Sequence, residues 1–206
     1  MKNIIALTLL FCLLATTQIS AQHFGLRAGL NATNAKFDVG SVEIDTEGQT
    51  NLLLGAFVTI PLAGEVLVIQ PEVTYLNRGF EVTDGFFGSE INLAYLDLGA
   101  LVRLNFGSDE GLGFYVGAGP YVTYAVSGKT TDIGGTEQDI DFDADRVKRS
   151  GLQFAGVGGL TFGSTLKFFV EARYMGSLSN LSDEDDIDIK QNSIGINGGV
   201  MVPLGF

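Results

Sequence analysis

The stretch LDLGALVRL at residues 96–104 alternates apolar residues with a second set that, apart from Leu101, is charged or small. Leu98 and Val102 fall in one set, whereas Asp97 and Arg103 fall in the other. Because successive side chains on a β-strand point to opposite faces, this period of two predicts a strand near residues 93–106 with one apolar face. A helix would instead need apolar residues three and four positions apart.

The same alternation recurs along the rest of the chain and predicts seven further strands. They cover residues 24–31, 50–61, 66–78, 113–127, 151–162, 168–177 and 193–206. The segment 151–162 is the weakest, because Gly156, Gly158 and Gly159 interrupt its pattern. A tilted strand needs about 9–11 residues to cross a membrane. We therefore predict an all-β fold, an eight-stranded antiparallel transmembrane up-and-down β-barrel.

The connections between the predicted strands alternate in length. Short links at residues 61–65, 107–112 and 163–165 follow the second, fourth and sixth strands. The links after the first, third, fifth and seventh strands are long and polar. Bacterial outer-membrane barrels have short periplasmic turns and longer extracellular loops, so this asymmetry favours that class.

A soluble, lipocalin-like binding protein is the main alternative, because such a cup also has eight alternating strands. A soluble cup turns its apolar face inward and needs charged or long polar side chains on the other face. Here the non-apolar faces hold mainly Gly, Asn, Thr and Tyr, and most charges lie in the loops. This distribution favours lipid outside and a narrow lumen inside.

The first residues are typical of a secretory signal. Lys2 supplies a positive charge, Ile4 to Ala15 form an apolar run, and Ser20-Ala21-Gln22 resemble a cleavage site with small residues. The run is shorter than the roughly 20 residues of a membrane-spanning helix. We predict a cleaved signal peptide at 1–22, followed by an outer-membrane β-barrel domain at 23–206 in the bacterial outer membrane.

The chain ends on an aromatic residue preceded by apolar residues at steps of two. These residues are Val200, Val202, Leu204 and Phe206. Outer-membrane barrels commonly end in this way, and the assembly machinery recognises the terminal strand. We therefore expect the barrel assembly machinery and outer-membrane lipid to be partners of this chain.

Six charged residues are predicted to face the lumen. They are Arg27, Glu72, Asp97, Arg103, Glu171 and Arg173. An eight-stranded barrel encloses barely enough space for side chains, so buried opposite charges should pair. We expect an internal plug that holds the barrel shut, with an ion path as the alternative.

Two acidic clusters in the predicted loops are weak candidates for a calcium site. Their members include Asp139, Asp141, Asp143, Asp183 and Asp185. Calcium prefers several carboxylate oxygens, but the first cluster lacks the Gly and Glu positions of an EF-hand. Solvated acidic loops are the preferred interpretation, so we predict no metal site.

Composition and single residues exclude several other functions. A net charge of −12 argues against nucleic acid, which is bound through Lys and Arg. The only cysteine, Cys12, lies in the predicted signal peptide, so no disulfide is expected. The only histidine, His23, would lie at a flexible terminus and would be a poor general base. We expect neither an enzyme nor a cofactor.

Aromatic residues cluster towards the predicted strand ends, where they are expected to form girdles at the two membrane interfaces. They are Tyr75, Phe80, Tyr95, Tyr124, Phe162, Phe168, Tyr174 and Phe206.

Several motifs in this order resemble a known family. They are FGLRAGLN at 24–31, QPE at 70–72, YLDL at 95–98, GAGP at 117–120 and EARY at 171–174. Together they resemble the small porin-family or PorT-like outer-membrane β-barrel domain of the Bacteroidetes. The resemblance implies fold and location, since functions within that family are diverse.

For function, we expect a structural or surface-interaction role through the long acidic loops. The alternatives are a small porin that passes solutes or ions, a subunit of a secretion apparatus with an unknown partner, and the soluble cup described above.

Overall fold

The computed structural model describes most of the chain. The described residues are 22–39, 42–45, 47–84, 87–107, 111–132, 134–142, 148–179 and 187–204. Phe206 and all of the predicted signal peptide except Gln22 lie outside them. No helix within these ranges is long and apolar enough to cross a membrane.

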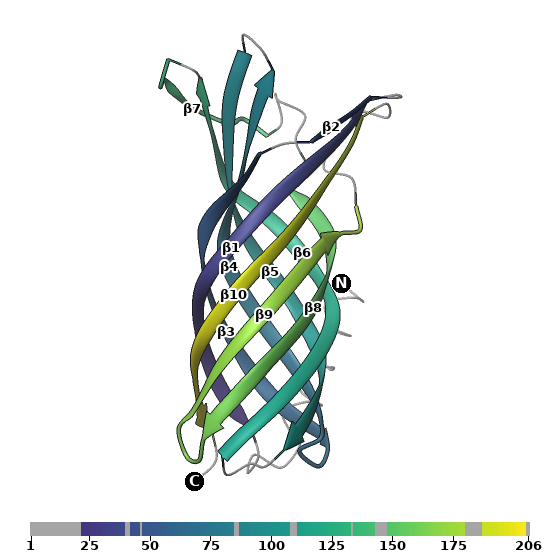
Figure 1. Ribbon diagram of the computed structural model, residues 1–206, viewed down its shortest axis with the longest axis vertical. Coiled ribbons are helices and arrows are strands. Elements are labelled where there is room, and N and C mark those ends of the chain that lie inside the picture. The colour runs from purple at the N-terminus through teal and green to yellow at the C-terminus, as the bar shows by residue number, and fades with distance from the viewer. Residues whose placement is uncertain are drawn as a thin grey trace, which may run out of the picture.

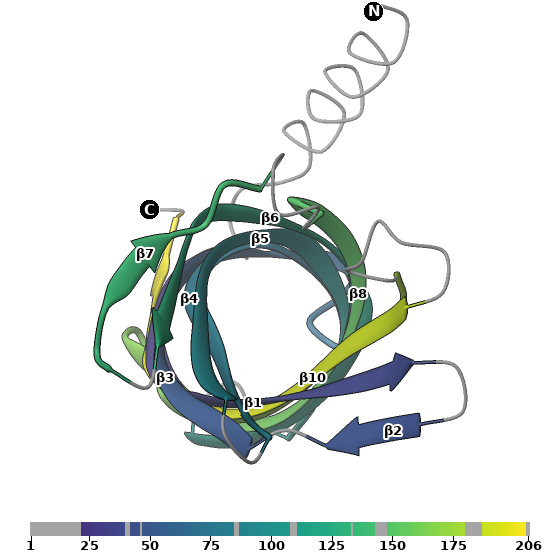
Figure 2. The same ribbon diagram turned by 90° about the horizontal axis from the view of Figure 1, so that it is seen from above.

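Eight long strands of the described chain close into one antiparallel barrel (Figures 1 and 2). They are β1 (His23–Val39), β3 (Glu47–Ala63), β4 (Leu67–Asp84), β5 (Phe87–Gly107), β6 (Gly111–Asp132), β8 (Ser150–Gly163), β9 (Lys167–Ser177) and β10 (Ile187–Pro203). Each strand pairs with the next barrel strand along the chain, and β10 returns to pair with β1 along its whole length. The predicted eight-stranded antiparallel barrel is confirmed.

The outer wall of the barrel is apolar. Leu98 and Val116 remain 55% and 51% exposed, whereas Asp97 on the inner face of β5 is completely buried. In a soluble cup the apolar faces would instead be hidden inside. The outward apolar faces therefore match a barrel surrounded by lipid.

The predicted long loops are largely strands, which corrects the strand ends proposed from the sequence. β4 and β5 continue as one hairpin to Asp84 and Phe87, past the predicted ends at 78 and 93. This hairpin projects from the top of the barrel in Figure 1. Backbone hydrogen bonds between neighbouring strands do not require an apolar face. Strand pairing therefore continues beyond the residues at which the apolar–polar alternation of the membrane-spanning part ends.

Two short strands flank this projecting end. β1 folds back onto β2 (Val42–Asp45), and β7 (Glu137–Asp139) pairs with the end of β6. At the opposite end, only residues 64–66 and 164–166 separate two of the strand pairs, as predicted. Gly64 in the first of these turns has a φ of 57°, a left-handed conformation that favours glycine.

Large inward-facing side chains lie opposite glycines on neighbouring strands. Tyr121 pairs with Gly99, and Tyr115 pairs with Gly159. Phe57 and Phe169 have the same relationship to Gly25 and Gly199. A ring can lie across the narrow lumen because the opposing residue has no side chain. Gly159, which weakens the sequence pattern of β8, therefore makes room for an aromatic ring.

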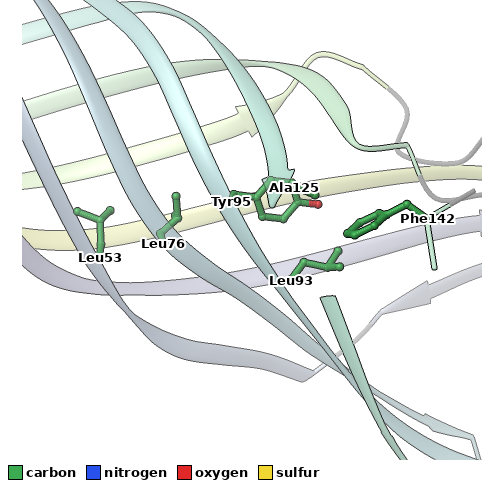
Figure 3. Close-up of a cluster of buried hydrophobic side chains, with 6 residues drawn as sticks. All are labelled: Leu53, Leu76, Leu93, Tyr95, Ala125 and Phe142. Atoms are coloured by element: carbon green, nitrogen blue, oxygen red, sulfur yellow. The ribbon is translucent and has the colours of Figure 1, made fainter. Parts of the chain in front are cut away.

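The half of the lumen nearer the projecting strands holds an apolar cluster (Figure 3). Its buried members are Leu53, Leu76, Leu93, Tyr95, Ala125 and Phe142. Phe142 comes from the segment after β7 and lies beside Tyr95 and Leu93 in the figure. The expectation that Tyr95 belongs to an interface girdle is wrong, because only 1% of Tyr95 is exposed.

The other predicted girdle residues with described side chains do lie on the outer wall. They are Tyr75, Tyr124, Phe162, Phe168 and Tyr174. The side chains of Phe80 and Phe206 lie outside the described part of the chain.

Candidate functional site in the barrel interior

Two arginines and two glutamates form a closed ring of ion pairs in the lumen. Arg27 of β1 lies 2.6 Å from Glu72 of β4 and 3.2 Å from Glu171 of β9. Arg173 of β9 lies 2.5 Å from Glu72 and 3.0 Å from Glu171. All four side chains are at most 1% exposed. We call this arrangement the four-residue ring.

The barrel provides space for the four-residue ring through glycine. Arg27 lies between Gly55 of β3 and Gly199 of β10. The other three members also each have a glycine neighbour: Gly99 for Glu72, Gly159 for Glu171 and Gly195 for Arg173. Each long charged side chain therefore has at least one neighbour without a side chain, which leaves room for it to extend across the lumen.

Two tyrosines supply further hydrogen bonds to the carboxylates. The hydroxyl of Tyr121 donates to Glu72, and the hydroxyl of Tyr115 donates to Oε2 of Glu171 at 3.0 Å. Buried ions are costly unless they are paired and their remaining acceptors are satisfied. Each glutamate in the ring therefore has both the opposite charges and the donor that burial requires.

A second ion pair lies above the ring and includes a residue that the sequence analysis missed. Asp97 pairs with Arg78 of β4, with 2.5 Å between Oδ2 and Nη2. Arg78 also donates to Oε1 of Gln153 at 2.9 Å, and its guanidinium lies 4.6 Å from the centre of the Tyr95 ring. Arg78 stands an even number of residues from Glu72, so strand alternation could have identified it as a further inward-facing charge.

Arg103 differs from the other buried arginines. It donates to Oε1 of Gln70 at 2.5 Å and to Oδ1 of Asn105 at 3.0 Å, and it lies over the Tyr115 ring at 3.7 Å. Its described neighbours include no carboxylate within ion-pair distance. The expectation that the six predicted charges pair among themselves is therefore wrong for Arg103, and Asp97 pairs with a seventh residue.

The other candidate residues lie away from this interior. Val202 and Leu204 are exposed on the outer wall, and Val200 lies beside Leu26 and Phe168. Asp139 ends β7, and Asp141 is exposed. Asp143, Asp183, Asp185 and Phe206 lie outside the described residues. The described part of the chain contains no group of three side chains that could hold a metal ion.

A closed barrel with an apolar outer wall and a polar, ion-paired interior defines an integral outer-membrane β-barrel protein. The chain belongs to the outer membrane protein beta-barrel domain family, whose model matches residues 17–183. This family places it in the bacterial outer membrane. A comparison with curated protein sequences found no match.

Several solved structures are similar to this chain. Ail of Yersinia pestis, determined with the heparin analogue sucrose octasulfate, is 14% identical over 87% of this chain and 98% of Ail, with a TM-score of 0.43. Neisserial surface protein A is 13% identical over 87% of this chain and 96% of that protein, with a TM-score of 0.47. The outer membrane enzyme PagL is 14% identical over 84% of this chain and 99% of PagL, with a TM-score of 0.42.

Proposed function

We propose that this protein is a non-conducting outer-membrane barrel that acts at the cell surface through its projecting strands. The observation that carries the proposal is the contact between Arg173 and Glu72. Their strands, β9 and β4, are four places apart in the eight-strand ring and so lie on opposite walls. The ion pair of 2.5 Å therefore spans the lumen.

The interior around this ion pair is filled. An eight-stranded barrel is just wide enough for side chains to occupy its centre. Here the four-residue ring lies between two layers. The phenyl groups of Phe57 and Phe169 lie on one side of it, and the Arg78–Asp97 pair lies on the other. These layers argue against the small-porin alternative, because a permeating ion would have to displace buried, paired charges.

The projecting strands supply the surface on which a partner could bind. β1 and β10 stay paired out to Val39 and Ile187, and the β4–β5 hairpin extends to Asp84 and Phe87. These strands extend beyond the closed barrel in Figure 1. A projecting strand presents both side chains and backbone groups, which are the usual means of recognition between a strand and a protein partner.

Bilayer recording tests the closed lumen. Purified protein in a planar bilayer should give no conductance steps above background, whereas an open porin prepared in the same way should give them. Regular steps from the folded protein would show that the charged layers leave a passage, and the proposal would fail.

Cysteine labelling tests which end faces outward. The predicted mature chain has no cysteine, so Gly134→Cys near β7 and Glu65→Cys in a short turn each create a single thiol. A bulky maleimide–polyethylene glycol should label Gly134→Cys on intact cells, and Glu65→Cys only after the outer membrane is opened. The reverse pattern would contradict the assignment of the projecting strands to the surface.

The charged residues of the barrel interior also support two further proposals. We propose that the protein is not an enzyme, because the buried carboxylates in the described part of the chain are all held by arginines and are not available as acids or bases. We also propose membership of the PorT-like group, since Glu72 of its QPE motif and both charges of its EARY motif form the four-residue ring with Arg27.

A further inference from the structure

We propose that the short-turn end of the barrel binds a small oxyanion on Arg103. A cavity of about 180 Å³ opens there and is lined by residues from all eight barrel strands. Its polar lining consists of one acidic residue, Glu65, together with His23, Thr59, Arg103, Asn105, Thr161 and Lys167. Arg103 belongs to this lining although only 4% of the residue is exposed.

The partners of Arg103 are neutral, and their orientations are fixed. The side-chain nitrogen of Gln70 donates to Glu72 at 2.8 Å, so its oxygen is directed towards Arg103. The side-chain nitrogen of Asn105 donates to the backbone oxygen of Glu65 at 2.8 Å, so its oxygen also faces Arg103. Both amides therefore accept hydrogen bonds from the guanidinium without neutralising its charge.

The buried charges of the described interior do not balance. Four arginines face three carboxylates, and each of those carboxylates is already held by Arg27, Arg78 or Arg173. The Nε atom of Arg103 is buried and has no acceptor. A buried cation without a counter-charge is costly, so an anion in the adjoining cavity would stabilise this end of the barrel.

The chemistry of the cavity selects the class of ligand. A guanidinium donates in a planar fork that suits carboxylate and phosphate oxygens. Thr59 and Thr161 add hydroxyl groups to the lining. The cavity of about 180 Å³ has room for a small anion beside Arg103. We assign the site to a free monoanion or dianion of the size of acetate or inorganic phosphate.

The test is a titration of the folded, full-length mature protein in a maltoside detergent, which contains no phosphate. Sodium phosphate, sodium acetate and sodium chloride are added separately, and the NMR signal of the Arg103 side-chain N–H is followed. Phosphate and acetate should shift this signal saturably, and chloride at the same ionic strength should not. Absence of a saturable shift with either oxyanion would overturn the proposal.

Matched variants locate the site. Asn105→Asp places a carboxylate beside Arg103 with little change of shape, and it should weaken phosphate binding at least tenfold, measured by calorimetry. Lys129→Gln removes one positive charge from the far end of β6 and should bind phosphate as the wild type does. Equal binding by Asn105→Asp and the wild type would place the anion elsewhere and refute the assignment.

Two further measurements test whether Arg103 itself binds the anion and whether a lipid headgroup supplies it. Arg103→Gln should abolish binding, with the mobility shift between boiled and unboiled samples on a gel as the check that the barrel is closed. Repeating the titration in bilayers that contain phosphatidylglycerol tests whether a lipid headgroup supplies the phosphate. Unchanged affinity there supports a free anion, whereas loss of the response would show that a headgroup already occupies Arg103 and would refute a free-anion site.

Discussion

Tyr121 of β6 lies directly opposite Gly99 of β5, so closely that a Cβ atom added to Gly99 would come within 2.3 Å of the tyrosine ring. The glycine therefore determines where the ring can lie. With the ring in this position, the Tyr121 hydroxyl reaches Glu72 on the next strand but one. A residue without a side chain thus positions a member of the hydrogen-bond network around the four-residue ring.

Gly99→Ala should destabilise the barrel, because the new methyl group forces the Tyr121 ring away from Glu72. Overpacking in a filled interior typically costs about 1–3 kcal/mol. The matched control is Gly156→Ala on the outer face of β8, where an added Cβ meets no atom within 4 Å. Urea unfolding in detergent should show a lower midpoint for Gly99→Ala alone. Equal midpoints for the two variants would mean that Tyr121 moves without cost.

Glu72→Gln should be one of the more damaging single changes in the interior. The substitution keeps the shape of the side chain but removes a carboxylate that both Arg27 and Arg173 contact. Removing one partner from a buried ion pair costs about 3–5 kcal/mol, since the remaining charges stay buried. The free energy of unfolding from urea titrations measures the loss.

The exposed pair of Lys129 and Glu137 supplies the control for this experiment. Their atoms lie 2.8 Å apart, but the two side chains are 57% and 61% exposed. Water screens such a pair, so Glu137→Gln should leave the unfolding midpoint unchanged. If Glu72→Gln were equally harmless, the four-residue ring would contribute nothing to stability.

Much of the barrel could be predicted from alternation alone. The period of two correctly placed all six expected lumen residues, including Asp97 and Arg103, on inner faces. It could not show which of them would meet, because pairing depends on the register between strands that are distant in sequence. Arg78 was missed because it stood at the predicted end of its strand. Arg78 lies opposite Leu93 on β5, and its long side chain reaches Asp97.

The glycines show a second limit of sequence analysis. In a single strand, a glycine only weakens the apolar pattern, as Gly159 does in β8. Its purpose becomes visible in the register, where it lies opposite Tyr115. Gly158, one residue earlier, faces outward into open space, so two adjacent glycines in one motif have different roles.

The charge on Glu137 should depend on Lys129. The hydrogen bond from Lys129, together with its positive charge, lowers the pKa of the Glu137 carboxyl below its ordinary 4.5. A lowered pKa means that the contact is complete at neutral pH and is lost as the pH falls through the folded-state value. In Lys129→Gln, an NMR titration should show the Glu137 pKa rising towards 4.5. An unchanged value would show that Lys129 does not hold this carboxylate in solution.

Phe142 should anchor the segment between β7 and β8 at the outer end of the barrel. Only 5% of Phe142 is exposed, and its ring lies under the guanidinium of Arg149 at 4.6 Å. In Phe142→Ala the segment loses its aromatic contact with Leu93 and Tyr95 in the apolar cluster. The segment should therefore detach from the barrel more often. The chain carries trypsin sites at Arg146, Lys148 and Arg149, and cleavage follows the population of the open form.

Cleavage of Phe142→Ala by trypsin should therefore be at least tenfold faster than that of the wild type. The gel-mobility shift of the closed barrel should be retained, because strand pairing does not involve Phe142. Gln138→Ala is the control, since it alters an exposed side chain on the adjoining strand β7. Equal cleavage rates in the wild type and Phe142→Ala would show that the aromatic contact does not restrain the segment. Loss of the mobility shift would mean instead that Phe142 supports the barrel itself.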